Sequence, residues 1–181
     1  MAEQPQSSYA KIALDLLQDA AQPGQMLLRV VSDSMKPWFQ AGDLLRIERC
    51  PILNLRCGDM ILWRNEQGLM THRVVALEPQ QMITKGDAVS IFDAPVKNTD
   101  VLGRVIGLEQ AGGTLLWTDS LWQATARWQA RLSLLEGRLQ MMAGRTAGPL
   151  RPWLSRCVRL WIWPYRRLTR LWVQWLKRRS G

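Results

Sequence analysis

Short apolar segments follow one another between residues 26 and 110, and Gly-Asp, Pro or Asn turns separate them. Segments of this length are too short for amphipathic helices and are typical of β-strands. A series of short strands joined by tight turns is typical of a small antiparallel barrel or sandwich, so we predict a mainly β domain. The expected strands cover residues 26–31, 44–48, 59–64, 69–77, 81–84 and 102–108.

Two segments outside this region have the residue spacing of amphipathic helices. Residues 9–20 follow Ser8, a favourable N-cap residue. Residues 111–114 are expected to form a turn, and residues 119–142 a second helix. The apolar stripe of this second helix consists of Leu121, Trp128, Leu132, Leu135, Leu139 and Met142. The predicted parts of the chain are an N-terminal segment (1–25), a β domain (26–112), an amphipathic helix with a hinge (113–148) and a helical tail (149–181).

A candidate nucleophile, Ser34, lies in the motif Ser-Asp-Ser-Met-Lys-Pro at residues 32–37. A serine hydroxyl is a weak nucleophile until a neighbouring base accepts its proton. His72 is the only histidine of the chain, and near neutral pH a histidine can accept this proton and later return it to a leaving group. A carboxylate beside the ring would fix the tautomer that this role requires.

Further short motifs follow Ser34 in a characteristic order. They are Gly-Asp at residues 42–43, Gly-Asp at 58–59, His-Arg-Val at 72–74, Lys-Gly-Asp at 85–87, and Asp93. Together with the serine motif they resemble the signal peptidase I superfamily, in particular its endoplasmic-reticulum and spore-former branch, in which the base is histidine. The resemblance implies a signal-peptidase/LexA-like fold, a small antiparallel β domain with a short N-terminal helix and a helical C-terminal extension.

The same resemblance assigns an activity and roles to individual residues. It implies a serine endopeptidase that cleaves precursor or signal-peptide-bearing polypeptides. The implied catalytic residues are the nucleophile Ser34, the base His72, and Asp93, which orients the histidine. The implied supporting residues are Ser32 near the oxyanion pocket, Met35 beneath the site, and Asp87, which holds the site together.

Two other functions stay open at this point. A LexA-like regulator that cleaves itself resembles this chain, but such a regulator uses a serine–lysine pair and a DNA-binding helix-turn-helix. A non-catalytic module could keep the fold and bind a peptide or a membrane, because motifs alone do not fix geometry. A lone histidine in a strand is more often structural than catalytic, so the distance between Ser34 and His72 discriminates between these functions.

The sequence predicts neither a metal site nor a cofactor. The three cysteines, Cys50, Cys57 and Cys157, form no CxxC pair, and a single histidine cannot complete a common zinc site without them. We therefore expect free thiols and metal-independent chemistry.

The tail combines basic residues with tryptophan. From residue 143 to residue 181 the chain has ten Lys or Arg and no Asp or Glu, which leaves 14 basic and 15 acidic residues elsewhere. A helix with Trp and Arg on its faces can lie in the interface of an anionic membrane. It could also pack on its own domain or on a partner. Nucleic-acid binding is not expected, because no known nucleic-acid-binding module is visible. The predicted membrane-binding residues are Trp161, Trp163, Arg166, Arg167, Arg170, Trp172 and Trp175.

Localisation is predicted from the N-terminus and from hydrophobicity. Residues 1–8 are polar and do not resemble a secretory signal. No window reaches the roughly 18 apolar residues expected of a spanning helix. We therefore expect a cytoplasmic protein that is peripheral at the inner membrane face.

Overall fold

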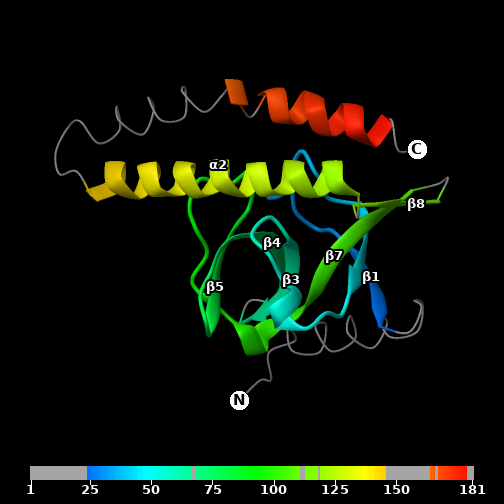
Figure 1. The fold of residues 1–181 in the computed structure, drawn as a ribbon, viewed down its shortest axis with the longest axis horizontal. Helices are drawn as coiled ribbons and strands as arrows, with labels where there is room; N and C mark the ends of the chain where they lie inside the picture. The colour runs from blue at the N-terminus through cyan, green and yellow to red at the C-terminus, as the bar shows by residue number, and fades with distance from the viewer. Residues whose placement is uncertain are drawn as a thin grey trace, which may run out of the picture.

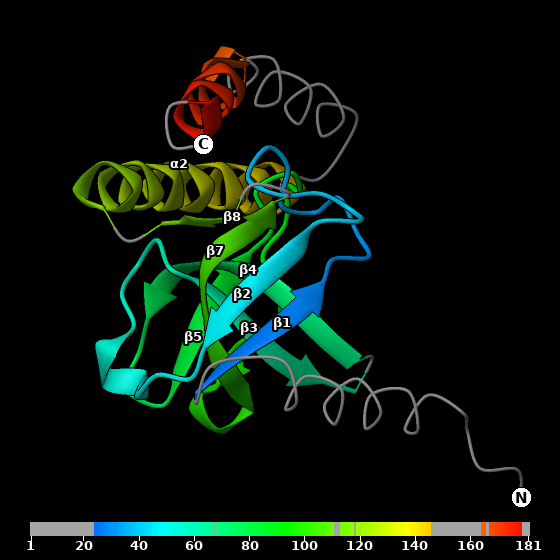
Figure 2. The same ribbon diagram turned by 90° about the vertical axis from the view of Figure 1, so that its right-hand side faces the viewer.

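The computed structural model describes residues 24–66, 68–110, 113–117, 119–145, 164–165 and 167–178, and the helix predicted at residues 9–20 lies outside them. Within these ranges, eight strands form one antiparallel sheet (Figures 1 and 2). Their order is β1-β2-β7-β3-β4-β5-β6, and β8 pairs with the part of β7 that extends past β3. The strands are β1 (Gln25–Arg29), β2 (Leu44–Glu48), β3 (Met60–Asn65), β4 (Gly68–Leu77), β5 (Gln81–Lys85), β6 (Val96–Lys97), β7 (Val101–Gln110) and β8 (Gly113–Leu116).

The prediction of a mainly β protein is confirmed, and all six expected strands are present, residues 44–48 with the same bounds and the other five with slightly shifted ends. The two short strands β6 and β8 were not predicted. The turn expected at residues 111–114 is wrong for Gly113 and Thr114, because both residues pair with β7 as part of β8. The glycines at 112 and 113 indicated a turn. In the structure Gly113 instead begins the short strand β8, where its small size allows the backbone to come close to β7. The signal-peptidase-like fold itself stays a prediction.

The helix α2 (Ser120–Arg145) crosses one end of the sheet (Figures 1 and 2). It begins where the Asp119 carboxylate accepts the backbone N–H of Trp122 at 2.7 Å, as an N-cap does. The predicted apolar stripe is only partly buried: Trp128, Leu135 and Met142 are 56%, 43% and 64% exposed, whereas Leu121, Leu132 and Leu139 are half-buried. The buried face instead includes Trp122, Gln129, Ala130, Ser133 and Glu136. This orientation brings polar groups of α2 against charged groups of the β domain.

A second helix lies beside α2 on the side away from the sheet, and residues 164–165 and 167–178 belong to it (Figures 1 and 2). Its residues Val173 and Leu176 are almost fully buried. Both belong to the main core cluster, together with Trp38 and Trp122. The last turns of this helix are therefore packed on the domain that precedes them.

The main core lies between the sheet, α2 and the loop of residues 30–43. Trp38 is its centre, with ring centroids 6.0 Å from Trp117 and 5.5 Å from Trp122. Aromatic rings at such distances add to the stabilisation from burial alone. The core therefore fixes the loop that carries Ser34.

Candidate active site

Ser34 lies in the loop between β1 and β2, and hydrogen bonds close this loop at its base. The backbone N–H of Val30 donates to the carbonyl of Asp43 at 2.8 Å, and the N–H of Gly42 donates back to the carbonyl of Val30 at 2.9 Å. The Asp33 carboxylate accepts hydrogen bonds from the Lys36 ammonium at 2.9 Å and from the N–H of Ala41 at 3.1 Å. These two hydrogen bonds lower the pKa of Asp33, with the Lys36 bond the larger cause.

Apolar side chains anchor the same loop from below. Met35, Trp38 and Phe39 are 0%, 1% and 2% exposed, whereas Ser34 is only half-buried. Met35 thus lies in the core directly after the serine, as the resemblance implied. The arrangement leaves the Ser34 hydroxyl near the surface on a rigid support.

Three side chains from distant parts of the chain form one line of hydrogen bonds. The His72 ring on β4 lies with Nε2 3.0 Å from Ser34 Oγ and with Nδ1 2.7 Å from Asp93 Oδ2. The His72 side chain is 6% exposed and that of Asp93 18% exposed. Asp93 Oδ2 also accepts the hydroxyl of Thr84 at 2.7 Å. These distances permit proton transfer from a serine to a histidine whose tautomer a carboxylate holds.

Gly86 allows the strand end after β5 to approach these groups closely. A Cβ atom at Gly86 would lie 2.8 Å from the carbonyl oxygen of Ser34 and 3.0 Å from His72 Nε2. Two residues further along, the N–H of Ala88 donates to the same Ser34 carbonyl at 2.8 Å. Only a residue without a side chain fits here, so residues 86–88 form one wall of the site.

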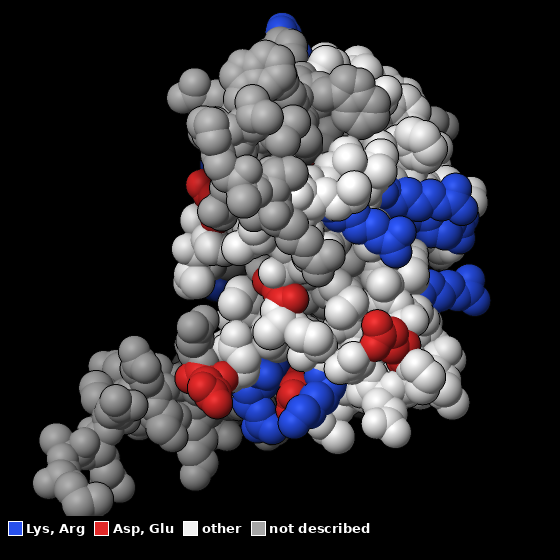
Figure 3. All heavy atoms as spheres, turned by 90° about the vertical axis from the view of Figure 1, so that its left-hand side faces the viewer, with Lys and Arg blue, Asp and Glu red and all other residues white. Residues whose placement is uncertain are grey.

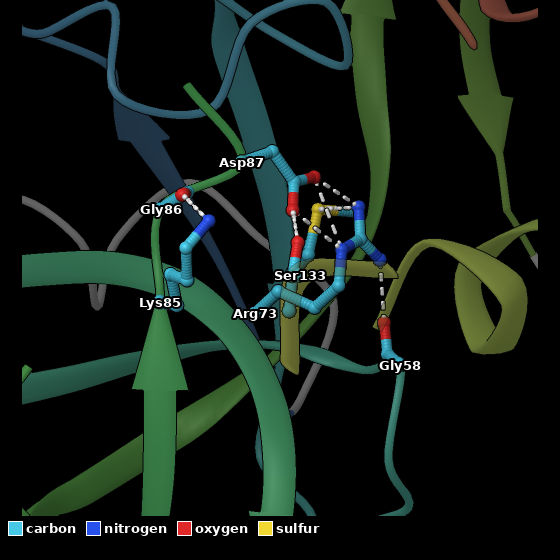
Figure 4. A network of polar contacts seen from close by, with 7 residues as sticks. Gly58, Arg73, Lys85, Gly86, Asp87 and Ser133 are labelled. Carbon is cyan, nitrogen blue, oxygen red and sulfur yellow. Dashed lines mark hydrogen bonds and ion pairs between the residues drawn. The ribbon is translucent and has the colours of Figure 1, made fainter. Parts of the chain in front are cut away.

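The predicted supporting residue Asp87 contacts Arg73, and the structure gives it no hydrogen bond to His72. Successive residues of a strand point to opposite faces, so Arg73 points away from the serine that His72 meets. The Arg73 guanidinium donates to Asp87 at 3.1, 3.0 and 2.7 Å and to the carbonyl of Gly58 at 2.6 Å (Figure 4). Both side chains of the pair are 0% exposed. The pair fixes β4 against the loop that follows β5.

Ser32, the predicted oxyanion residue, is exposed beside the candidate nucleophile. Its hydroxyl oxygen lies 3.2 Å from that of Ser34. The Ser32 hydroxyl is therefore close enough to donate a hydrogen bond to the oxyanion that forms when Ser34 attacks a substrate carbonyl.

Sequence reasoning missed four residues that support this site. Arg73 lies inside the His-Arg-Val motif but received no role, and Thr84 precedes the Lys-Gly-Asp motif. Ser133 and Glu136 lie on α2, and their polar character within a half-apolar helix is a signal of contact with buried charges. Lys85 is the buried charge that Glu136 meets, at 2.9 Å.

The predicted membrane-binding residues divide into two groups. Trp161, Trp163 and Arg166 lie outside the described residues. Arg167, Arg170, Trp172 and Trp175 are exposed on the C-terminal helix. The rings of Trp172 and Trp175 stack at 4.9 Å, and Trp172 Nε1 donates to Thr125 on α2 at 3.1 Å.

The surface and the cysteines give further information on possible partners. The described residues on the face drawn in Figure 3 carry acidic and basic side chains in separate small groups among uncharged ones. Cys50 and Cys57 are free thiols, and burial raises the pKa of both. The described residues contain no group of three or more metal-ligating side chains.

No helix in the described part of the chain combines the length and hydrophobicity needed to cross a bilayer. Comparisons with protein-family models and with curated proteins found no match to this chain. The function is therefore argued from the geometry of Ser34, His72 and Asp93 and from the motifs around them.

Proposed function

We propose that this protein is a serine endopeptidase whose nucleophile is Ser34. One observation carries the proposal: the 3.0 Å contact between Ser34 Oγ and His72 Nε2, with Asp93 on the opposite nitrogen of the ring at 2.7 Å. The histidine is buried, the serine is half-buried, and the loop that presents the serine is anchored in the core. This is the arrangement of base, orienting carboxylate and accessible nucleophile that acyl transfer needs.

The mechanism has two steps, and His72 moves the proton in both. In the first step, Ser34 Oγ attacks the carbonyl carbon of the scissile peptide bond while His72 Nε2 accepts the hydroxyl proton. The resulting imidazolium gives that proton to the leaving amine, and the carboxylate of Asp93 stabilises its positive charge. In the second step, His72 removes a proton from water, which hydrolyses the acyl-enzyme and restores the Ser34 hydroxyl. We assign the developing oxyanion to the Ser34 backbone N–H and the Ser32 hydroxyl.

The proposed substrates are precursor or signal-peptide-bearing polypeptides. Two features support this class. The order of the motifs resembles the signal peptidase I superfamily. The candidate nucleophile Ser34 is only half-buried, so a polypeptide can reach it from the surface.

The test uses the full chain and a complex mixture of peptides. Mass spectrometry would identify new peptide termini that appear with the wild-type protein. We expect them to disappear in Ser34→Ala and His72→Ala, and to persist in the matched control Ser120→Ala, an exposed serine at the start of α2. New termini that persist in Ser34→Ala would contradict the mechanism. Peptides that bind without being cleaved would favour the non-catalytic binding module.

A second function, attachment to an anionic membrane, is proposed for the C-terminal helix. This helix exposes Leu168, Leu171, Trp172 and Trp175 by 63%, 56%, 41% and 45%, although the Trp172 ring also donates a hydrogen bond to Thr125 on α2. Exposed apolar and aromatic residues of this kind, with arginines nearby, are typical of helices that lie in the membrane interface.

Vesicle sedimentation tests this second proposal. We expect the protein to bind vesicles that contain phosphatidylserine and to lose this binding in Leu168→Asn/Leu171→Asn. Leu53→Asn is the control, because Leu53 is 96% exposed and lies before β3, outside the C-terminal helix. Equal binding of all three proteins would show that this helix is not the anchor.

A further inference from the structure

One turn of α2, residues 133–137, contacts the segment that carries part of the candidate site. This segment, residues 84–93, is called the site loop below. It begins at Thr84 and ends at Asp93, the two residues whose side chains meet at Asp93 Oδ2. Its Gly86 lies against Ser34 and His72. The position of the site loop therefore decides where the carboxylate of Asp93 lies relative to the His72 ring on β4.

The first contact is a buried ion pair. Lys85 Nζ lies 2.9 Å from Glu136 Oε2, and the two side chains are 0% and 4% exposed. Lys85 Nζ also donates to the carbonyl of Gly86 at 3.3 Å (Figure 4). A buried ammonium needs an anionic partner, and its removal leaves a buried charge uncompensated. Glu136 therefore fixes the residue that directly precedes Gly86.

The second contact acts on the residue that follows Gly86. The Ser133 hydroxyl donates to Asp87 Oδ1 at 3.3 Å, while Arg73 holds the same carboxylate from β4 (Figure 4). Ser133 is 1% exposed, so this hydrogen bond is shielded from water. Both neighbours of Gly86 are thus connected to the same turn of α2.

The third contact lies at the other end of the site loop. A Cβ atom at Gly137 would lie 2.2 Å, 2.5 Å and 2.6 Å from three atoms of the Phe92 ring. The ring therefore packs directly on the backbone of α2, and only glycine allows this approach. Phe92 immediately precedes Asp93, so the contact restrains the residue whose carboxylate meets His72.

We propose that residues Ser133, Glu136 and Gly137 of α2 are positioning residues for the candidate site. They hold the site loop at both ends, and through it they keep Asp93 on His72 Nδ1 and Gly86 beside His72 Nε2. They act on the site through their contacts with Lys85, Asp87 and Phe92. The proposal rests on the proposed function, but its test does not depend on activity alone.

The direct readout is the ring of His72. It is the only histidine, so a protein labelled with ¹⁵N-histidine gives ring signals from this one residue. In the wild-type protein we expect a slowly exchanging Nδ1 proton held by Asp93. In Glu136→Gln and in Gly137→Ala we expect this proton signal to disappear. We also expect kcat to fall about 10- to 10²-fold with little change in KM, because a misplacement of about 1 Å has this effect.

Two controls separate positioning from general damage to the fold. Glu109→Gln breaks an ion pair with Arg46 of 2.6 Å at a different place on the sheet and should leave the ring signal and kcat unchanged. Phe92→Leu added to Gly137→Ala makes room for the new methyl group and should restore part of kcat. This second pair of variants decides the question even where Glu136→Gln fails to fold.

The outcomes for the proposal are distinct. An unchanged ring proton and an unchanged kcat in both Glu136→Gln and Gly137→Ala would overturn it. A change of equal size in Glu109→Gln would also overturn it, since the effect would then not be specific to this turn of α2. If the wild-type protein cleaves no peptide, the proposed function fails, whereas the ring proton still shows whether α2 positions Asp93 against His72.

Discussion

Replacing Asp93 with asparagine removes a charge from the candidate site while keeping its shape. In the proposed mechanism His72 becomes an imidazolium in the transition state, and the Asp93 carboxylate lies 2.7 Å from its Nδ1. Two unit charges about 4 Å apart attract each other by about 4 kcal/mol near a protein surface. The 18% exposure of Asp93 places the pair in this regime rather than in a dry interior.

The asparagine variant keeps part of this interaction, because an amide oxygen still accepts a hydrogen bond. A neutral hydrogen bond contributes about 1 kcal/mol, so the loss should be about 2–4 kcal/mol. At about 1.4 kcal/mol for each tenfold change in rate, kcat/KM should fall roughly 30- to 10³-fold. If the amide instead presents its NH₂ group to the ring, His72 takes the other tautomer and can no longer accept the Ser34 proton. The loss should then approach about 10⁴-fold.

The assay joins the rate to the tautomer. Steady-state cleavage of a peptide found with the wild-type protein gives kcat/KM, and the ¹⁵N shifts of the single histidine show which ring nitrogen carries the proton. Thr84→Val is the control, because it removes a hydrogen bond to Asp93 without removing charge and should cost about 1 kcal/mol, or about fivefold. A loss below about fivefold in Asp93→Asn, or full activity with the proton on Nε2, would refute the assigned role of Asp93.

Three further predictions concern stability, measured as the free energy of unfolding in urea. Arg73→Met leaves the buried carboxylate of Asp87 without its cationic partner and should cost about 3–5 kcal/mol, so a loss below about 1 kcal/mol would contradict the pair's importance. Gly103→Ala places a Cβ 2.6 Å from the last carbonyl oxygen of β2. This substitution should lower the free energy of unfolding by about 1–3 kcal/mol. An unchanged free energy of unfolding would mean that β2 and β7 can move apart without loss of stability. Burial alone would raise the pKa of Glu109, but the hydrogen bonds from Arg46 and Thr114 and the positive charge of Arg46 together outweigh burial, so the pKa is lowered. This stabilisation is present above the usual glutamate pKa of about 4.3 and is lost as pH falls through the lowered pKa. Glu109→Gln should therefore destabilise the protein at neutral pH and lose that difference in acid; a constant difference at all pH values would contradict the pKa shift.

The strands could be predicted from the sequence because their signals are local. Apolar residues separated by Gly, Pro and Asn turns indicated six strands, and only the two shortest were missed. The site is different, since its side chains come from positions 38 and 21 residues apart. No periodicity connects Ser34, His72 and Asp93, so their selection depended on the resemblance to a family. Their distances follow from strand pairing and from the loop around Gly86, which local patterns do not specify.

The orientation of α2 shows why the remaining part could not be predicted. Hydrophobicity alone places the stripe of Trp128, Leu135 and Met142 inward and sends charged residues to solvent. The structure departs from this pattern at part of the helix, because Lys85 and Asp87 are buried beneath it and need polar partners. Burying Glu136 and Ser133 gives Lys85 and Asp87 their polar partners. The same orientation of the helix leaves three apolar side chains exposed to solvent, which is unfavourable. The polar residues on the inner side of α2 thus report the position of buried charges in the β domain, which no property of the helix sequence alone contains.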